Sequence, residues 1–367
     1  MHRYFDPAVW GAVPFHFWSL ALFTLGCIVG SFLNVCIYRM PLGMSVVSPP
    51  SHCPRCGYSI PWYRNLPLIT WLWQRGKCAN CAAPISPRYF LVELLTGGAF
   101  LASWLVVGNH SAPMALAYCL LLAGFITATF IDFEHFIIPD EITIGGMFAG
   151  FICSALSPAL HGTSVATAAM QRSVIGMAVG AGVVYGVLRL GKLMFGRLKI
   201  ELPANAKLIF TDTALVLPDR EMPYEEIFYR KSDTIAIDAQ TVELVDRCFK
   251  GVPVRLSPTR LHIGSEEFNP ETVIHMEVVT SKLVLPREAM GLGDVKFMGA
   301  IGAFLGWKAA LFSLMISSVI GALVGVVFIV LRRQEWSSKI PYGPYIALAA
   351  VIWMFGGHRL LDFWFGR

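Results

Sequence analysis

The sequence is poor in charge. Of its 367 residues, 14% are Asp, Glu, Lys or Arg and 55% are hydrophobic, and the mean hydropathy is +0.59. A soluble protein of this size carries about a quarter charged residues, so the composition argues against a single water-soluble globule. The charges are also uneven, because residues 197–286 hold 25 of the 53. We therefore interpret the chain as a membrane protein with one soluble insert.

Three common catalytic patterns are missing. No G-x-S-x-G marks a serine nucleophile, and no H-E-x-x-H marks a catalytic zinc. Gly291-Leu292-Gly293 does not extend to G-x-G-x-x-G, because position 296 is Lys, so a dinucleotide fold is not indicated. The net charge of +5 is too small to indicate nucleic-acid binding.

Long apolar runs are abundant. A bilayer span needs about 20 mainly apolar residues, and seven segments qualify. A shorter eighth segment contains Gly299, Gly302 and Gly306, a pattern that favours close helix packing. We predict an all-α polytopic membrane protein with about eight transmembrane helices, at residues 17–38, 89–107, 113–131, 142–160, 173–190, 295–307, 309–331 and 343–362.

The short loops predict an orientation. Residues 39–88 contain six Lys or Arg and no acid, so this loop should be cytoplasmic. The N-terminus is then outside, and residues 132–141 and the insert are inside. We also expect the cationic loop to lie on anionic lipid headgroups.

The insert reads as a β-rich domain. Residues 207–217, 234–245 and 272–285 contain alternating or β-branched runs separated by prolines. The predicted organisation is an N-terminal segment with the first helix, a cysteine-containing loop, helices two to five, the β-rich insert, and helices six to eight. The corresponding residue ranges are 1–38, 39–88, 89–196, 197–286 and 287–367.

Four of the nine cysteines form two C-x-x-C pairs. Cys53 and Cys56 are separated from Cys78 and Cys81 by 21 residues. Two such pairs are typical of a tetrahedral Zn²⁺ site in which every ligand is a thiolate. Two disulfides or four unliganded thiols are the alternatives, and a reducing cytoplasm disfavours the disulfides. With all four positions filled by sulfur, we expect the zinc to be structural.

Two aspartates lie at predicted helix ends. Asp132 directly follows an uncharged run, and Asp294 begins the span after the insert. Taken alone, each aspartate is explained equally well as an ordinary acid at a helix end that is hydrated at the membrane–water interface. Because two predicted spans separate them, however, both should face the same side of the membrane, where helix packing could bring them together.

Such a pair can do acid–base chemistry. Two carboxyl groups a few ångströms apart do not both ionise easily, so one keeps a proton while the other acts as a base. The pair can then activate a water and protonate a peptide carbonyl or leaving amine. Gly291 and Gly293 would permit the close approach of backbone or of a substrate strand.

Four features, in order along the chain, resemble the type IV prepilin peptidases. These are bifunctional leader peptidase/N-methyltransferases of the G-x-G-D class of membrane aspartyl proteases. The features are the GSFLNVCIYRMP start at residues 30–41, the paired C-x-x-C loop, the segment from Asp132 to Asp140, and the segment from Gly291 to Lys296. Together they span most of the chain outside the insert.

The resemblance implies an activity. Asp132 and Asp294 correspond to the catalytic pair, with Gly291, Gly293 and Lys296 in the supporting loop, and the four cysteines correspond to the zinc ligands. The enzyme would cleave the short basic leader of prepilins and pseudopilins after a glycine, at the cytoplasmic face of the bacterial inner membrane. It would then methylate the new N-terminal amine with S-adenosylmethionine, although no nucleotide fingerprint identifies the residues that bind this donor.

Three details remain open at this stage. The acids Glu134, Asp140 and Glu141 should attract a basic leader. Glu93 either pairs with a basic group such as Lys296 or is an interfacial acid. The insert, which the resemblance does not include, could gate the site, decorate the protein, or dock a pilus or secretion component, and docking is favoured.

Two alternative functions come from other classes. A non-enzymatic zinc-bearing membrane scaffold would recruit partners through the insert, and its function would survive the loss of either aspartate. A transporter would use carboxylates in a proton pathway, but acids in such a pathway should lie in mid-span, whereas Asp132 and Asp294 lie at helix ends.

Overall fold

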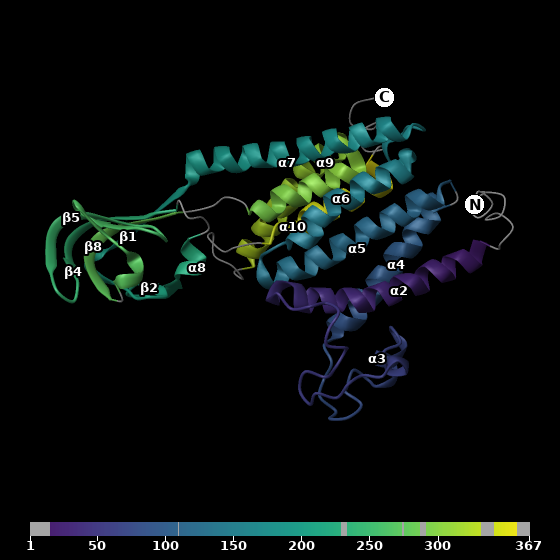
Figure 1. Ribbon diagram of the computed structural model, residues 1–367, viewed down its shortest axis with the longest axis horizontal. Coiled ribbons are helices and arrows are strands. Elements are labelled where there is room, and N and C mark those ends of the chain that lie inside the picture. Colours follow the sequence, from purple (N-terminus) through teal and green to yellow (C-terminus); the bar gives the residue numbers. More distant parts are fainter. Residues whose placement is uncertain are drawn as a thin grey trace. The chain divides into compact units, whose positions relative to one another are not determined.

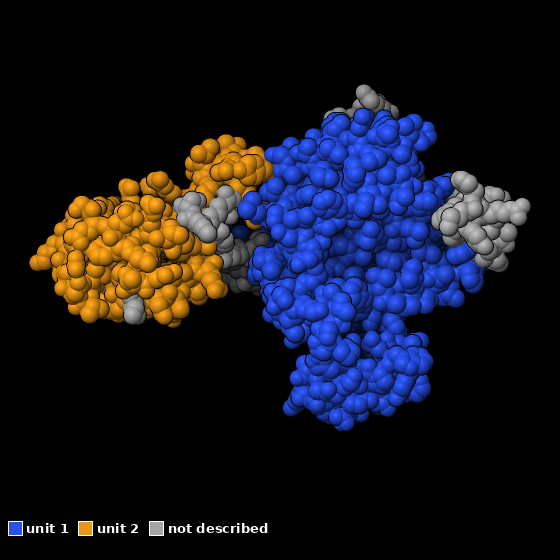
Figure 2. Space-filling model, viewed as in Figure 1, with its two compact units in different colours: residues 1–184, 292–367 blue, residues 185–291 orange. Residues whose placement is uncertain are grey.

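A computed structural model describes residues 15–108, 110–228, 233–273, 275–286, 291–331 and 341–357 (Figure 1). The chain divides into two compact units (Figure 2). The helical unit comprises residues 1–184 and 292–367, and the sheet unit comprises residues 185–291.

The helical unit is a bundle of apolar helices. An additional helix, α3 (Ile69–Trp73), lies in the loop between the first two. A π-helical turn, Trp104–Gly108, extends α4. The helices of the bundle are α2 (Phe15–Arg39), α4 (Pro87–Ser103), α5 (Ala112–His135), α6 (Asp140–Leu156), α7 (Ala166–Phe195, which continues into the sheet unit), α9 (Leu292–Val330) and α10 (Gly343–Ile352).

Local sequence explains where these helices begin and end. Ser86 and Ser111 are the N-caps of α4 and α5, and each side chain accepts a backbone N–H from the first turn. Phe136 ends α5 in the left-handed conformation, with φ 55°. Pro139 precedes α6, whose first turn holds two acids that suit the positive end of the helix dipole.

Among the residues that the structure describes, five helices are long and apolar enough to cross a membrane: α2, α4 with its π turn, α5, α7 and α9. Helices α6 and α10 are shorter, at 17 and 10 residues. The 39-residue α9 is interrupted at Gly306, where φ is 81° and ψ is 173°. The prediction of an α-helical membrane protein with a β-rich region is confirmed, whereas the number of eight spans stays a prediction.

Glycines allow two pairs of helices to approach closely. A Cβ on Gly26 or Gly30 of α2 would come within 2.7 Å of the α4 backbone. A Cβ on Gly302 of α9 would lie 2.0 Å from the carbonyl oxygen of Gly176 in α7. Small residues at such crossings are what helix association in a bilayer requires, because packing there has no water-driven term. Close helix packing was predicted for Gly302 and is confirmed.

The sheet unit contains one eight-stranded antiparallel sheet in the order β3-β2-β1-β8-β4-β5-β6-β7. A short helix, α8 (Tyr224–Ile227), follows β3. The core comes from alternate strand residues such as Leu208, Ile235 and Val278, whose side chains are fully buried. The strands are β1 (Arg197–Phe210), β2 (Ala214–Val216), β3 (Glu221–Pro223), β4 (Ile235–Glu243), β5 (Cys248–Leu256), β6 (Leu261–Ile263), β7 (Glu266–Phe268) and β8 (Met276–Pro286).

One central strand escaped prediction. Strand β5 contains Gly251 and Pro253, two residues that usually interrupt strands. Pro253 is accommodated opposite Asp238 of β4, and the neighbouring strand β6 pairs with β5 only from Val254 onward. The missing N–H of Pro253 therefore costs this sheet little.

Candidate functional site

Asp132 lies in the last turn of α5 and is buried, with 5% of its surface exposed. Its carboxyl oxygen Oδ2 accepts a hydrogen bond from the backbone N–H of Gly343, at 2.8 Å. Gly343 is the first residue of α10. A carboxyl group 211 positions earlier in the chain is thus held by the beginning of the last described helix.

Asp294 lies in the first turn of α9 and is also buried, with 9% exposed. A Cβ on the preceding residue, Gly293, would lie 3.4 Å from Cβ of Ile138, in the loop that follows Asp132. A Cβ on Gly343 would lie 3.0 Å from Cδ1 of the same isoleucine. Ile138 therefore contacts both the segment before Asp294 and the glycine that binds Asp132.

The helices that carry the two aspartates also touch. Phe125 of α5 and Phe297 of α9 form an edge-to-face pair with centroids 5.5 Å apart. Both rings are almost completely buried. This contact fixes the two helices one to two turns from the aspartates, so the buried acids belong to one region of the bundle.

Ion pairs join the helix ends around this region. Lys296 of α9 binds both carboxyl oxygens of Asp140, at 2.6 and 2.9 Å. Arg88, at the start of α4, pairs with Glu134 near the end of α5. Two of the three acids expected to attract a leader are therefore paired with cations. Glu141 is exposed and makes no ion pair within the described part of the chain.

Of the two alternatives for Glu93, the ion pair with Lys296 is wrong. Glu93 is buried on α4, and its Oε2 accepts the backbone N–H of Leu68, at 2.7 Å. Leu68 immediately precedes α3 and has φ 61°. Because it lies outside the helix, its N–H has no acceptor within α3. A buried carboxyl group thus anchors the cysteine-containing loop to the bundle, while Lys296 binds Asp140 instead.

The four cysteines of that loop converge. The sulfur atoms of Cys53, Cys56, Cys78 and Cys81 all lie within 4.8 Å of one another. Those of Cys53 and Cys81 are 3.9 Å apart. A tetrahedral Zn²⁺ with bonds of about 2.3 Å separates its sulfurs by about 3.8 Å, so the donor set fits this metal.

The two C-x-x-C turns have the same backbone design. Cys53 and Cys78 each accept an N–H from the residue four positions later, Gly57 and Ala82 respectively, and both of those residues have positive φ, 70° and 55°. Backbone N–H groups of Cys81, then of Asn80, lower the pKa of Cys78 to about 6. Turns that aim N–H groups at sulfur favour the thiolate, which is the form that binds metal.

Gly343 was missed by the sequence analysis. Its neighbour Tyr342 shares hydrogen bonds of 2.8 and 3.0 Å with the hydroxyls of Ser317 and Ser318 on α9. The sequence Pro341-Tyr342-Gly343-Pro344 is a compact turn signal directly before an apolar run, and such a signal marks a constrained segment. This turn signal does not reveal that Gly343 binds Asp132, 211 residues earlier in the chain.

Comparison with known proteins gives matches along most of the chain. Residues 24–107 match the family described as the bacterial peptidase A24 N-terminal domain. Residues 119–200 and 236–326 match the type IV leader peptidase family. No solved structure matches the chain.

Curated relatives carry one shared name, prepilin leader peptidase/N-methyltransferase. The protein of Aeromonas hydrophila is 26% identical over 368 residues, which cover 93% of this chain and 92% of the relative. The protein of Dichelobacter nodosus is 32% identical over 212 residues, 50% of this chain and 70% of the relative. The protein of Myxococcus xanthus is 41% identical over 193 residues, 49% of this chain and 57% of the relative.

Proposed function

Since the chain belongs to the type IV leader peptidase family, we propose that it is a membrane aspartyl endopeptidase. Its substrates are the leaders of type IV prepilins or pseudopilins, cleaved after a glycine at the cytoplasmic face of the inner membrane. The names of the relatives support a second activity, N-methylation of the new terminus with S-adenosylmethionine.

The proposal depends most on the two buried aspartates. Asp132 and Asp294 lie at the ends of packed helices, and Ile138 contacts the segments that position both. One carboxylate takes a proton from a water whose oxygen attacks the scissile carbonyl carbon, and the other carboxyl gives its proton to the carbonyl oxygen. The first aspartate then gives the proton it took from water to the amide nitrogen as the C–N bond breaks, and the second aspartate recovers a proton from the gem-diol as the new carboxyl group forms. Burial serves this chemistry because it excludes bulk water from the pair.

Three residues near Asp294 would support the pair. Gly293 packs on Ile138, and Gly291, two residues earlier, is exposed. Lys296 holds Asp140 and so ties the start of α9 to the start of α6. Both side chains of this ion pair are partly exposed, so it positions the helices rather than adding much to stability.

We propose that Cys53, Cys56, Cys78 and Cys81 hold a structural Zn²⁺. The metal would cross-link the two halves of a loop in which α3 is the only α-helix among the described residues between α2 and α4. Since the donor set has four thiolates, it leaves no open position for substrate.

The same loop is proposed to rest on lipid headgroups. Trp62 and Trp73 are 80% and 85% exposed, and residues 39–88 contain no acid. Exposed tryptophans beside Arg and Lys are typical of membrane–water interfaces. The cationic loop would then mark the cytoplasmic side, in agreement with the orientation expected from the sequence.

Attraction of a basic leader is proposed for the acids near Asp132. Because Arg88 offsets Glu134 and Lys296 offsets Asp140, the field of this strip is weaker than the sequence alone indicates. Glu141 is the exposed acid that retains its full charge toward solvent. We therefore assign most of the attraction to Glu141.

The test is cleavage of a prepilin by the detergent-purified protein. Asp132→Asn and Asp294→Asn should each reduce leader removal to background, because an amide can neither accept nor supply the proton. Asp246→Asn, at an exposed position of the sheet unit, is the matched control and should cleave normally, whereas Glu141→Gln should lose rate most at low salt. Full cleavage by either Asn variant would refute the two-carboxylate mechanism. Absence of cleavage by the unaltered protein would favour a non-enzymatic scaffold.

A further inference from the structure

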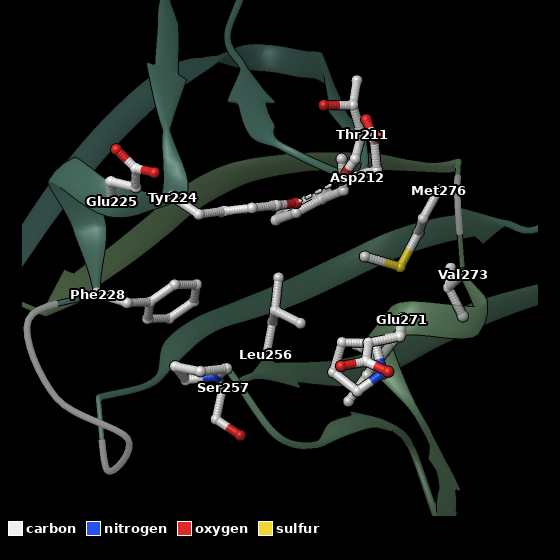
Figure 3. A pocket seen from close by; sticks show the side chains of 14 residues that line it. Thr211, Asp212, Tyr224, Glu225, Phe228, Leu256, Ser257, Glu271, Val273 and Met276 are labelled. Atoms are coloured by element: carbon white, nitrogen blue, oxygen red, sulfur yellow. Dashed lines mark hydrogen bonds between the residues drawn. The ribbon is translucent and has the colours of Figure 1, made fainter.

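A pocket of about 520 Å³ opens in the sheet unit, and neither Asp132 nor Asp294 lines it (Figure 3). It is formed where β1 and β5 end and β8 begins, and α8 contributes one wall. Its volume lies in the usual range of ligand-binding pockets, about 300 to 1,000 Å³.

The interior of the pocket is apolar. Its floor consists of core residues that include Phe210, Leu256 and Met276, each at most 6% exposed. The rings of Tyr224 and Phe228 pack together with centroids 5.7 Å apart, and Figure 3 shows both directed into the hollow. The Tyr224 hydroxyl donates to the backbone carbonyl of Thr211, so its polar atom is already satisfied.

The edge of the pocket is acidic. Asp212, Glu225 and Glu271 come from three separate segments, and all three are exposed. None of the fourteen lining residues is Lys, Arg or His. None of the three acids forms an ion pair with a residue that the structure describes.

This segregation of charge is local to the pocket. Residues 197–286 contain 11 basic and 14 acidic residues, so the unit is not short of cations. A second hollow of about 400 Å³ on the same sheet is lined by Lys199, Arg255 and Lys282 as well as two acids. Among the residues that the structure describes, the first pocket therefore combines an apolar interior with an edge whose charged side chains are all acidic, which attracts a cation that carries an apolar group.

We propose that this pocket binds a basic peptide segment, with one large apolar side chain in the hollow and Lys or Arg side chains at the three carboxylates. The apolar contact would give most of the affinity. The exposed charges would select the sign of the ligand and make binding sensitive to salt. The interaction is recognition without chemistry, and it requires neither Asp132 nor Asp294.

Binding can be measured with the full chain in nanodiscs of phosphatidylcholine, a lipid without net charge. The probe is a fluorescent hexapeptide of alternating lysine and leucine, and its partner probe alternates glutamate and leucine. Anisotropy should show saturable binding of the lysine peptide alone. The Asp132→Asn protein should bind it equally well, so failure of the peptidase proposal would leave this result unchanged.

Neutralising the pocket tests the role of charge. The triple variant Asp212→Asn, Glu225→Gln, Glu271→Gln should bind at least tenfold more weakly. The control Asp219→Asn, Glu221→Gln, Glu243→Gln changes the net charge equally at exposed positions outside the pocket and should bind as the unaltered chain does.

The apolar wall gives a separate test. Phe228→Ala should weaken binding about fivefold while the salt dependence persists. Equal binding of both probes, or an equal loss in the two triple variants, would overturn the proposal. Binding that Phe228→Ala does not affect would show adsorption to surface carboxylates alone and would overturn it as well.

Discussion

At the residue scale, the central contact is the hydrogen bond from Gly343 to Asp132. It holds one carboxyl oxygen of a buried acid in a fixed direction. A side chain at position 343 would place its Cβ 2.9 Å from that oxygen. Space for Asp132 therefore depends on a glycine in another helix.

We predict that Gly343→Ala slows prepilin cleavage about 100-fold, because a displacement of about 1 Å at a catalytic group has an effect of this size. Initial cleavage rates check the prediction. Gly145→Ala is the control, since a Cβ there meets nothing within 4 Å. Normal cleavage by Gly343→Ala would mean that the Asp132 carboxyl does not need this position.

The cysteine cluster predicts a dependence on pH. Backbone N–H groups lower the pKa of Cys78 to about 6, whereas for Cys81 the Ala83 N–H is outweighed by burial and the neighbouring sulfurs, which raise the pKa to about 11. Metal must displace the protons that remain on the cluster, so zinc competes with acid, and below pH 6 Cys78 is protonated as well. Zinc measured by mass spectrometry after dialysis against a weak chelator should stay near one per chain at pH 7.5. It should fall steeply below pH 6.

Two serine variants provide the control for this cluster. Cys78→Ser should lose the metal at pH 7.5, whereas Cys248→Ser, which alters an exposed thiol outside the cluster, should retain it. Zinc retained by Cys78→Ser, or absent from the unaltered protein at pH 7.5, would contradict a four-thiolate site.

The residues proposed to carry chemistry could be selected from the sequence, whereas those that position them could not. Asp132, Asp294 and the four cysteines stand out because charge next to an apolar run, and paired C-x-x-C, are rare by chance. Gly343 and Ile138 have no such pattern. Their importance comes from contacts between distant segments, which sequence spacing does not encode.

At the element scale, helix α9 shows how a 39-residue helix changes direction inside the bundle. The carbonyl oxygen of Ala303 accepts hydrogen bonds from Ser154 of α6 and Ser173 of α7, at 3.3 and 2.8 Å. Gly306 follows with a positive φ. Serines from two neighbours thus satisfy a carbonyl just before the interruption, which is a recognised cause of a kink. The sequence analysis placed a boundary close to this point, between the predicted spans 295–307 and 309–331.

We predict that Gly302→Ala lowers the free energy of unfolding by about 1 to 3 kcal/mol, because its Cβ would overlap the Gly176 carbonyl in α7. Thermal unfolding in detergent measures the change. Gly182→Ala, at a position of α7 with nothing within 4 Å, should leave the transition unchanged or raise it. Equal transitions for both variants would show that α7 and α9 do not pack in this way.

At the scale of the whole molecule, the distribution of charge indicated where the strands lie. The alternation of apolar residues indicated only some of the individual strands. The concentration of charge in residues 197–286 separates a soluble segment from apolar ones, and the strands run from Arg197 to Pro286. The edge strands β3 and β7 have three residues each and are too short to give a pattern. Strand β5 was not predicted because it contains Pro253. The ends of the helices were closer to prediction because a bilayer demands long uninterrupted apolar runs.

The most direct test of the account asks whether the side chains at positions 132 and 294 meet. Asp132→Cys and Asp294→Cys are combined in a chain whose five cysteines outside the cluster are serine, and the protein in nanodiscs is treated with a mild oxidant. Digestion and mass spectrometry should find a disulfide between the two positions in most molecules. The control pair Asp294→Cys with Leu156→Cys, at the opposite end of α6, should give none. Equal yields from the two pairs would contradict a shared site for the aspartates.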